Sequence, residues 1–161
     1  MLALCLDPGT EKSGIVLYDG ISVILSQSDY QNEALLNFSP PTTIDVVVIE
    51  KIVSYGMAVG QTTLDTCVWI GRFIERFGPD KTVLISRKDV KLQLCNSLRA
   101  KDANVRQAVM DKFPATGGGK TPVVGTIKQP GPLYGVSGHA WSALALGITY
   151  FETLQSCENC R

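Results

Sequence analysis

Hydrophobic residues recur along the chain first in short runs and later at helical spacing. The short runs rich in Leu, Val and Ile lie at residues 2–7, 13–18, 21–26, 44–49 and 82–85. Because each is too short for a stable helix, they predict five strands. Asp19-Gly20 separates the second run from the third, and this dipeptide between two such runs is the strongest short-range signal for a β-hairpin. The nearly unbroken run at 44–49 is typical of a central strand buried on both faces.

Apolar residues three and four positions apart predict the helices. We expect helices at residues 31–37, 61–77, 87–97, 102–113 and 138–154, with Asp102 as a plausible N-cap of the fourth. Residues 114–135 hold four of the eight prolines and six glycines, and they predict a long irregular loop. An antiparallel opening followed by helices that alternate with two more strands indicates an α/β fold, with a five-stranded sheet of mixed direction flanked by helices.

The length of 161 residues suits one domain with a full hydrophobic core. We therefore expect a single domain over residues 1–161 with a short flexible C-terminal tail from about residue 155. No apolar run approaches the roughly 20 residues of a membrane span, and no secretory signal opens the chain. These features predict a cytoplasmic protein with no membrane partner.

Two carboxylates stand where predicted strands end. Asp7 closes the first strand and Glu50 closes the fourth. Carboxylates at the ends of central strands carry a high desolvation cost, and a divalent cation would offset it. Such a cation is the usual agent of phosphodiester hydrolysis. His139, the only histidine, heads the last predicted helix and is a candidate third ligand.

Charge is distributed unevenly although the net charge is zero. Residues 1–50 hold seven acidic residues and one basic residue, whereas residues 81–128 hold ten basic residues and three acidic ones. A basic half beside an acidic pocket is what an enzyme acting on a polyanion needs. The alternative is a charged, solvated helical surface. The candidates for phosphate contact are Arg87, Lys88, Lys91, Arg99, Lys101 and Arg106, and Lys101 is the favoured neighbour of a scissile phosphate.

The cysteines and the glycine-rich stretch of the chain give weaker indications of function. Cys5, Cys67 and Cys95 lie in apolar segments and are expected to be buried free thiols, while Cys157 and Cys160 form a CxxC without a second ligand pair for zinc. The glycine-rich stretch 117–119 before a Lys-Thr pair lacks the first glycine and the preceding strand of a phosphate-binding loop. We expect no nucleotide cofactor, and we expect this loop to be a flexible, basic contact with DNA.

The order of these parts resembles the RNase H-like nuclease superfamily, and within it the RuvC-type Holliday junction resolvases, specifically the small phage-encoded ones. The stretches that carry the resemblance are Leu6-Asp7-Pro8-Gly9-Thr10, Val48-Ile49-Glu50-Lys51, residues 99–108, residues 129–135 and Gly138-His139-Ala140-Trp141-Ser142-Ala143-Leu144-Ala145. Each motif alone is weak, but the ordered set is fairly specific and spans about residues 2–152.

The resemblance implies an RNase H-like fold and a metal-dependent endodeoxyribonuclease that cuts four-way and other branched DNA symmetrically. It implies Asp7, Glu50 and His139 as catalytic residues and ligands of Mg²⁺ or Mn²⁺, with two ions per site. His139 would ligate an ion or shuttle a proton. The fourth family position, usually acidic, falls on Ser142, one helical turn after His139. If an acidic ligand is missing there, Ser142→Asp should lower the Mg²⁺ concentration needed.

A junction with two symmetric cut sites also implies a homodimer. Helix 61–77 offers Val68, Trp69 and Phe73 for a dimer face, or equally for ordinary core. In the loop after Glu50, Tyr55 and Met57 are candidates to stack on an exposed base, or to pack on their own domain. DNA-binding candidates are therefore Tyr55, Lys88, Lys91, Lys101 and Arg106.

The rival functions are a ribonuclease H acting on RNA–DNA hybrids and a non-catalytic junction-binding protein. A nucleotide-binding domain of the actin or sugar-kinase type also opens with an Asp-x-Gly-Thr turn. Such proteins need two of these domains, and this chain is too short for both.

Overall fold

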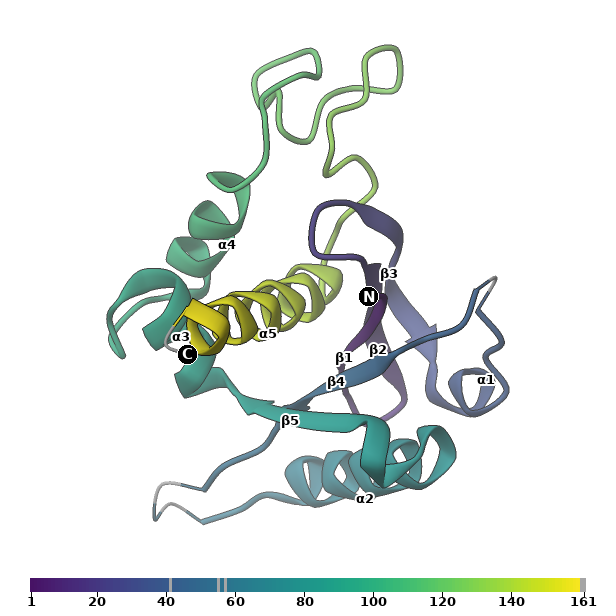
Figure 1. The fold of residues 1–161 in the computed structure, drawn as a ribbon. Helices are drawn as coiled ribbons and strands as arrows, with labels where there is room; N and C mark the ends of the chain where they lie inside the picture. Colours follow the sequence, from purple (N-terminus) through teal and green to yellow (C-terminus); the bar gives the residue numbers. More distant parts are fainter. Residues whose placement is uncertain (41, 55, 57, 160–161) are drawn as a thin grey trace.

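A mixed five-stranded sheet forms the centre of the protein, with helices on both faces (Figure 1). The computed structural model describes residues 1–40, 42–54, 56 and 58–159. Along the chain the elements are β1 (Ala3–Asp7), β2 (Lys12–Tyr18), β3 (Val23–Gln31), α1 (Asn32–Leu36), β4 (Val46–Lys51), α2 (Gln61–Phe77), the 3₁₀ turn η1 (Pro79–Lys81), β5 (Thr82–Ser86), α3 (Arg87–Cys95), α4 (Asp102–Met110) and α5 (Ala140–Asn159).

The strand order is β3-β2-β1-β4-β5. β1, β2 and β3 pair antiparallel, whereas β4 pairs parallel with both β1 and β5. The predicted mixed α/β sheet is thus confirmed. The β2–β3 hairpin turns at Asp19-Gly20, where the Asp19 carboxylate accepts backbone hydrogen bonds from Ile21 and Ser22 and Gly20 has a positive φ of 96°.

The boundaries of several elements differ from the predictions, most of all in β3 and α5. β3 runs to Gln31, five residues beyond the predicted end at residue 26. α5 continues to Asn159, so most of the expected tail is helical. The N-cap prediction for Asp102 was wrong: Lys101 is the N-cap of α4, and the Asp102 carboxylate instead accepts a hydrogen bond from Arg87.

Two hydrophobic cores lie on opposite faces of the sheet because side chains alternate along each strand. In β1, Ala3 and Cys5 face the core under α3, α4 and α5, whereas Leu4 and Leu6 face the core under α1 and α2. Phe73 is fully buried in the second core, with Trp69 packed against it. Of the three α2 residues considered for a dimer face, only Val68 is exposed.

α5 lies directly on the strands that end at Asp7 and Tyr18. A side chain on Gly147 would place its Cβ 2.7 Å from the Cys5 sulfur, so glycine permits this close approach. Cys5 is buried, as expected, but Cys67 is exposed and its predicted burial was wrong. Among the described helices, none combines the length and the apolar character of a membrane span.

The loop at residues 114–135 projects away from the sheet (Figure 1). Backbone hydrogen bonds tie it to itself: Gly117 N donates to Pro122 O, Gly118 N to Gln129 O and Gly131 N to Val124 O. Ile127 is 85% exposed. The loop is therefore cross-linked by its own backbone, with an apolar side chain among the most exposed in the protein.

Candidate active site

Asp7 is the last residue of β1, and Glu50 is the last but one of the neighbouring parallel strand β4. β1 pairs with β4 so that Leu6 lies opposite Ile49, which brings the next residues, Asp7 and Glu50, to the same edge of the sheet. Besides burial, the charge of Asp7 raises the pKa of Glu50. Two carboxyl groups so close cannot both ionise without a large electrostatic cost, so the pair either holds a proton or attracts a cation.

His139 approaches the same edge from the start of α5. Its Nδ1 lies 3.2 Å from Asp7 Oδ2, and its side chain is 67% exposed, whereas that of Asp7 is only 15% exposed. The backbone N–H of His139 donates to Ser28 Oγ on β3 at 3.0 Å. Asp7 therefore lies between Glu50 and a solvent-facing imidazole.

Gly14 makes room for this approach. It pairs with Asp7 across β1 and β2, and a Cβ built on it would lie 2.5 Å from the backbone C and O atoms of His139. Any larger residue at position 14 must push the start of α5 away from Asp7.

We predict that Gly14→Ala lowers the free energy of unfolding by about 1–3 kcal/mol, because overpacking displaces backbone. It should also reduce any activity of the site more than that loss of folded protein accounts for. Thermal unfolding and a nuclease assay measure the two effects. Gly71→Ala is the control for stability, since no atom lies within 4 Å of a Cβ there and alanine favours the helix. An unchanged melting temperature for Gly14→Ala would contradict the prediction.

The turn after Asp7 is held by a buried amide. The Asn32 side chain accepts a hydrogen bond from Ser13 Oγ at 2.6 Å and donates to the carbonyl of Gly9 at 3.0 Å, and its backbone N–H donates to Glu11 O. Both Asn32 and Ser13 are buried. This network fixes the path of the chain immediately beyond Asp7 and thereby restrains the carboxylate.

Arg87 connects α3, α4 and α5 beside the carboxylates. Its Nη1 donates to Ser142 Oγ at 3.1 Å and its Nη2 donates to Asp102 Oδ1 at 2.6 Å. The Asp102 carboxylate raises the pKa of Arg87, and Arg87 lowers the pKa of Asp102. The guanidinium is therefore a fixed positive charge at this edge of the sheet.

Glu50 is the group whose ionisation the site perturbs most. Burial, followed by the charge of Asp7 and the hydrogen bond with it, raises the pKa of Glu50 from 4.5 to about 8, although the charge of Arg87 opposes this rise. The neutral acid is consequently the stable form at neutral pH unless a cation arrives.

The donor set fits one hard cation better than two. Asp7 and Glu50 supply adjacent carboxylate oxygens, and Mg²⁺ is commonly bound through one or two carboxylates with several retained waters. Among the described residues, no three carboxylate, imidazole or thiol groups are arranged as ligands around a common point. On the Ser142 side, the hydroxyl and Asp102 already accept from Arg87.

A pocket of about 530 Å³ opens beside His139, the hydrogen-bond partner of Asp7, although neither Asp7 nor Glu50 lines it. Its lining includes Arg87, Asp102, Arg106, His139, Trp141 and Ser142. Arg106 lies over the Trp141 ring, with its guanidinium carbon 4.4 Å from the ring centroid. Two guanidinium groups and an imidazole therefore face a space beside the paired acids.

Two solved structures are similar to this chain in fold. The chain is similar to Thermus thermophilus RuvC in complex with a Holliday junction substrate, with a TM-score of 0.63 and 15% identity over 97% of this chain and 96% of that chain. It is also similar to another Thermus thermophilus RuvC structure, with a TM-score of 0.56 and 16% identity over 97% of each chain. The chain has the RuvC fold. No protein-family model and no curated protein sequence matches it.

Within this RuvC fold, the basic candidates for DNA contact lie beside the pocket rather than across the molecule from it. Lys88 and Lys91 line, with Arg87 and Leu98, an adjoining pocket of about 350 Å³. Lys101 and Arg106 are exposed on α4. Tyr55 and Met57 lie outside the described residues.

The sequence alone did not single out three contributors to the RuvC-fold site. Asn32 acts through its buried side-chain amide and Gly14 through its lack of a side chain, and no motif marks either position. Arg87 was one of several basic candidates, and its contact with Ser142 links positions 55 residues apart. Only one feature of the sequence pointed to a difference at this site: Ser142 stands on the last helix where the family usually has an acidic residue.

Proposed function

We propose that the protein is an endodeoxyribonuclease that resolves four-way and other branched DNA by Mg²⁺- or Mn²⁺-dependent hydrolysis. The observation that carries the proposal is the Asp7–Glu50 pair, with its raised Glu50 pKa, whose neighbour His139 lines a pocket together with Arg87 and Arg106. A partly buried acid pair can bind a cation, and the two arginines can bind a phosphodiester. The RuvC fold supports the choice of branched DNA, because one similar structure is a RuvC complex with a Holliday junction substrate.

Hydrolysis joins a water oxygen to phosphorus and breaks the bond from phosphorus to the 3′-oxygen, leaving a 5′-phosphate and a 3′-hydroxyl. A bound divalent ion would supply an acidified water and neutralise charge on the phosphate oxygens. Asp7 and Glu50 would hold this ion in place, because each lies on a rigid strand. His139 is exposed and hydrogen-bonded to Asp7, so its imidazole is placed to move a proton between the reacting oxygens and solvent.

The test is a labelled four-way junction incubated with the protein and Mg²⁺ or Mn²⁺. Paired nicks placed symmetrically across the junction are the expected result. Cleavage of an RNA–DNA hybrid with no effect on branched DNA would favour the ribonuclease H alternative. Tight junction binding without cleavage under either ion would favour a non-catalytic binding protein, the alternative that Ser142 suggests.

Two symmetric cuts call for two sites, and we propose a two-fold homodimer. The described surface of α2 and the segment before it exposes large apolar side chains, among them Val59, Leu64 and Val68, the last being 63% exposed. They lie on the opposite face of the sheet from α5. A self-complementary apolar surface is what an isologous interface needs.

We predict that Val68→Glu converts the dimer to a monomer, because a carboxylate must be desolvated at the interface. Light scattering coupled to size-exclusion chromatography measures the mass. Nicks should then appear on single strands rather than in symmetric pairs. Ile21→Glu is the matched control, since Ile21 is an exposed apolar residue in the β2–β3 turn. A Val68→Glu dimer would rule out this surface as the interface.

A further inference from the structure

Arg87 is bound to two oxygen donors of the pocket that His139 lines. His139 lies 3.2 Å from Asp7 of the acid pair. On the α5 residue one turn after His139, Ser142, the hydroxyl accepts from Arg87 Nη1. Asp102, which lines the same pocket, accepts from Arg87 Nη2. Both residues are thus already bound to a guanidinium.

The positive charge of Arg87 acts on the acid pair itself. Burial alone would lower the pKa of Arg87, but the hydrogen bond with Asp102 and the charges of Glu50, Asp102 and Asp7 raise it, so the guanidinium keeps its positive charge. The side chain of Arg87 is only 28% exposed, so water screens these interactions incompletely. A second divalent ion entering here would meet this charge directly.

We propose that the site binds a single divalent ion, at Asp7 and Glu50, and that Arg87 occupies the position of a second ion and binds the scissile phosphate. This inference rests on the proposed function and specifies its mechanism. A guanidinium presents two parallel N–H donors to a phosphate, and it carries its charge without needing metal from solution. The pocket of about 530 Å³ that Arg87 lines, together with Arg106, provides the space for the phosphate.

Asp102 holds Arg87 in place until DNA arrives. Its side chain is 79% exposed, and an ion pair with so exposed a partner stabilises the fold only weakly. A phosphate oxygen is an acceptor of the same kind as the carboxylate, so exchange of one for the other preserves the hydrogen bond to Nη2. The Ser142 hydroxyl would continue to orient Nη1.

The number of ions is the direct test. Titration of the full chain with Mn²⁺, followed by electron paramagnetic resonance of the free ion, should give one bound ion per protomer for the wild type. Arg87→Gln combined with Ser142→Asp removes the guanidinium and adds a carboxylate, and this variant should bind two. Two ions on the wild type, or one on a double variant whose circular dichroism spectrum is native, would overturn the proposal.

A second test follows DNA binding in the presence of a chelator, where no ion contributes. Arg87→Gln should weaken binding of a four-way junction about tenfold, the worth of a charge-assisted hydrogen bond. Arg87→Lys should restore only part of the lost junction binding, because a lysine ammonium lacks the two parallel N–H donors of a guanidinium. Asp102→Asn should strengthen binding. Tighter binding by Arg87→Gln, or weaker binding by Asp102→Asn, would contradict the proposal.

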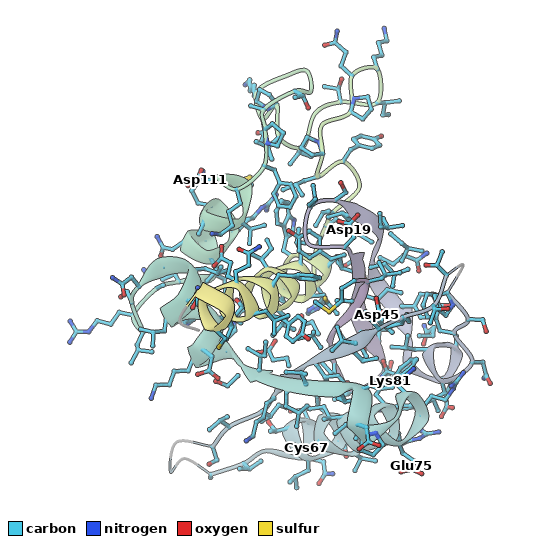
Figure 2. The ribbon with its side chains drawn as sticks, viewed as in Figure 1. Asp19, Asp45, Cys67, Glu75, Lys81 and Asp111 are labelled. Atoms are coloured by element: carbon cyan, nitrogen blue, oxygen red, sulfur yellow. The ribbon has the colours of Figure 1, made fainter. Side chains whose placement is uncertain are left out.

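Lys81→Gln is the matched control for charge. Lys81 is an exposed residue of η1, before β5, and Figure 2 shows it far from Asp111 at the C-terminal end of α4. Its loss should alter junction binding far less than that of Arg87. A wild type that neither binds nor cuts junctions refutes the proposed function, whereas one that cuts junctions with two bound ions refutes only the role given to Arg87.

The same arrangement changes the expectation for Ser142→Asp. From the sequence, a carboxylate at position 142 should lower the Mg²⁺ requirement. In the structure, that carboxylate would lie within reach of Arg87 and pair with it. Ser142→Asp alone should therefore leave the Mg²⁺ requirement nearly unchanged, and only the variant that also lacks Arg87 should recruit another ion. A lowered requirement in the single variant would count against the proposal.

Discussion

Asp7→Asn should cut a four-way junction about a thousandfold more slowly than the wild type while folding normally and binding the junction with similar affinity. An amide keeps the shape of the side chain and its place opposite Gly14, but it removes the charge that holds a cation. Loss of metal assistance is worth several kcal/mol of barrier, and each 1.36 kcal/mol is tenfold in rate. Single-turnover cleavage and junction binding by fluorescence anisotropy measure the two properties.

Asp80→Asn is the control for Asp7→Asn. Asp80 is an exposed carboxylate in η1, before β5, and it has no part in the proposed site. Its loss should leave both cleavage and binding unchanged. Equal cutting by Asp7→Asn and the wild type would end the nuclease proposal.

Glu50→Gln should abolish cutting and yet stabilise the protein at pH 8. The folded-state pKa of Glu50 is raised to about 8 from 4.5, so the folded state holds a proton that the unfolded state has already lost. Wild-type stability therefore falls as the pH rises from about 5 to 8. Glutamine mimics the protonated acid and stays neutral at every pH, so the variant does not lose stability by ionisation at this position.

The size of this effect is set by the burial of the pair. After allowance for partial exposure, Glu50→Gln should be more stable than the wild type at pH 8 by about 2 kcal/mol, or roughly 5 °C in melting temperature. The difference should vanish near pH 5. Adding Mn²⁺ at pH 8 should raise the melting temperature of the wild type but not of the variant, because only the wild type binds the ion.

Glu75→Gln, on the exposed surface of α2, is the control: it retains Glu50, so the difference between its melting temperature and that of the wild type should not change between pH 5 and 8. A wild-type melting temperature that stays flat or rises between pH 5 and 8 would contradict the assignment of a proton to the acid pair. A Glu50→Gln variant that cuts normally would show that the site lies elsewhere.

Periodicity alone predicted the five strands and the helices, because short runs of alternating or continuous apolar residues and 3.6-residue spacing report burial directly. It also placed Asp7 and Glu50 at strand ends. Their meeting depends on β1 and β4 being parallel neighbours, a consequence of the strand order that spacing cannot express. The resemblance implied only an RNase H-like fold, and the structure shows that β1 and β4 are parallel neighbours.

The errors have a common physical origin. An aspartate at the start of a helix can cap it or pair across to another element, and the local sequence is the same in both cases; Asp102 pairs with Arg87. Phe73 and Val68 both follow the helical period of α2, but only tertiary packing decided that Phe73 is core and Val68 is surface. The Arg87–Ser142 contact depends on how α3 packs against α5, which no local pattern reports.

α5 follows every other described helix and strand along the chain, and this order has a consequence for synthesis. The helix covers the sheet face that contains Cys5 and Val48, carries Ser142, and directly follows His139. A polypeptide still on the ribosome, extended only to the loop before α5, would lack His139, Ser142 and the cover of one core. The proposed site can therefore assemble only after α5 has been synthesised.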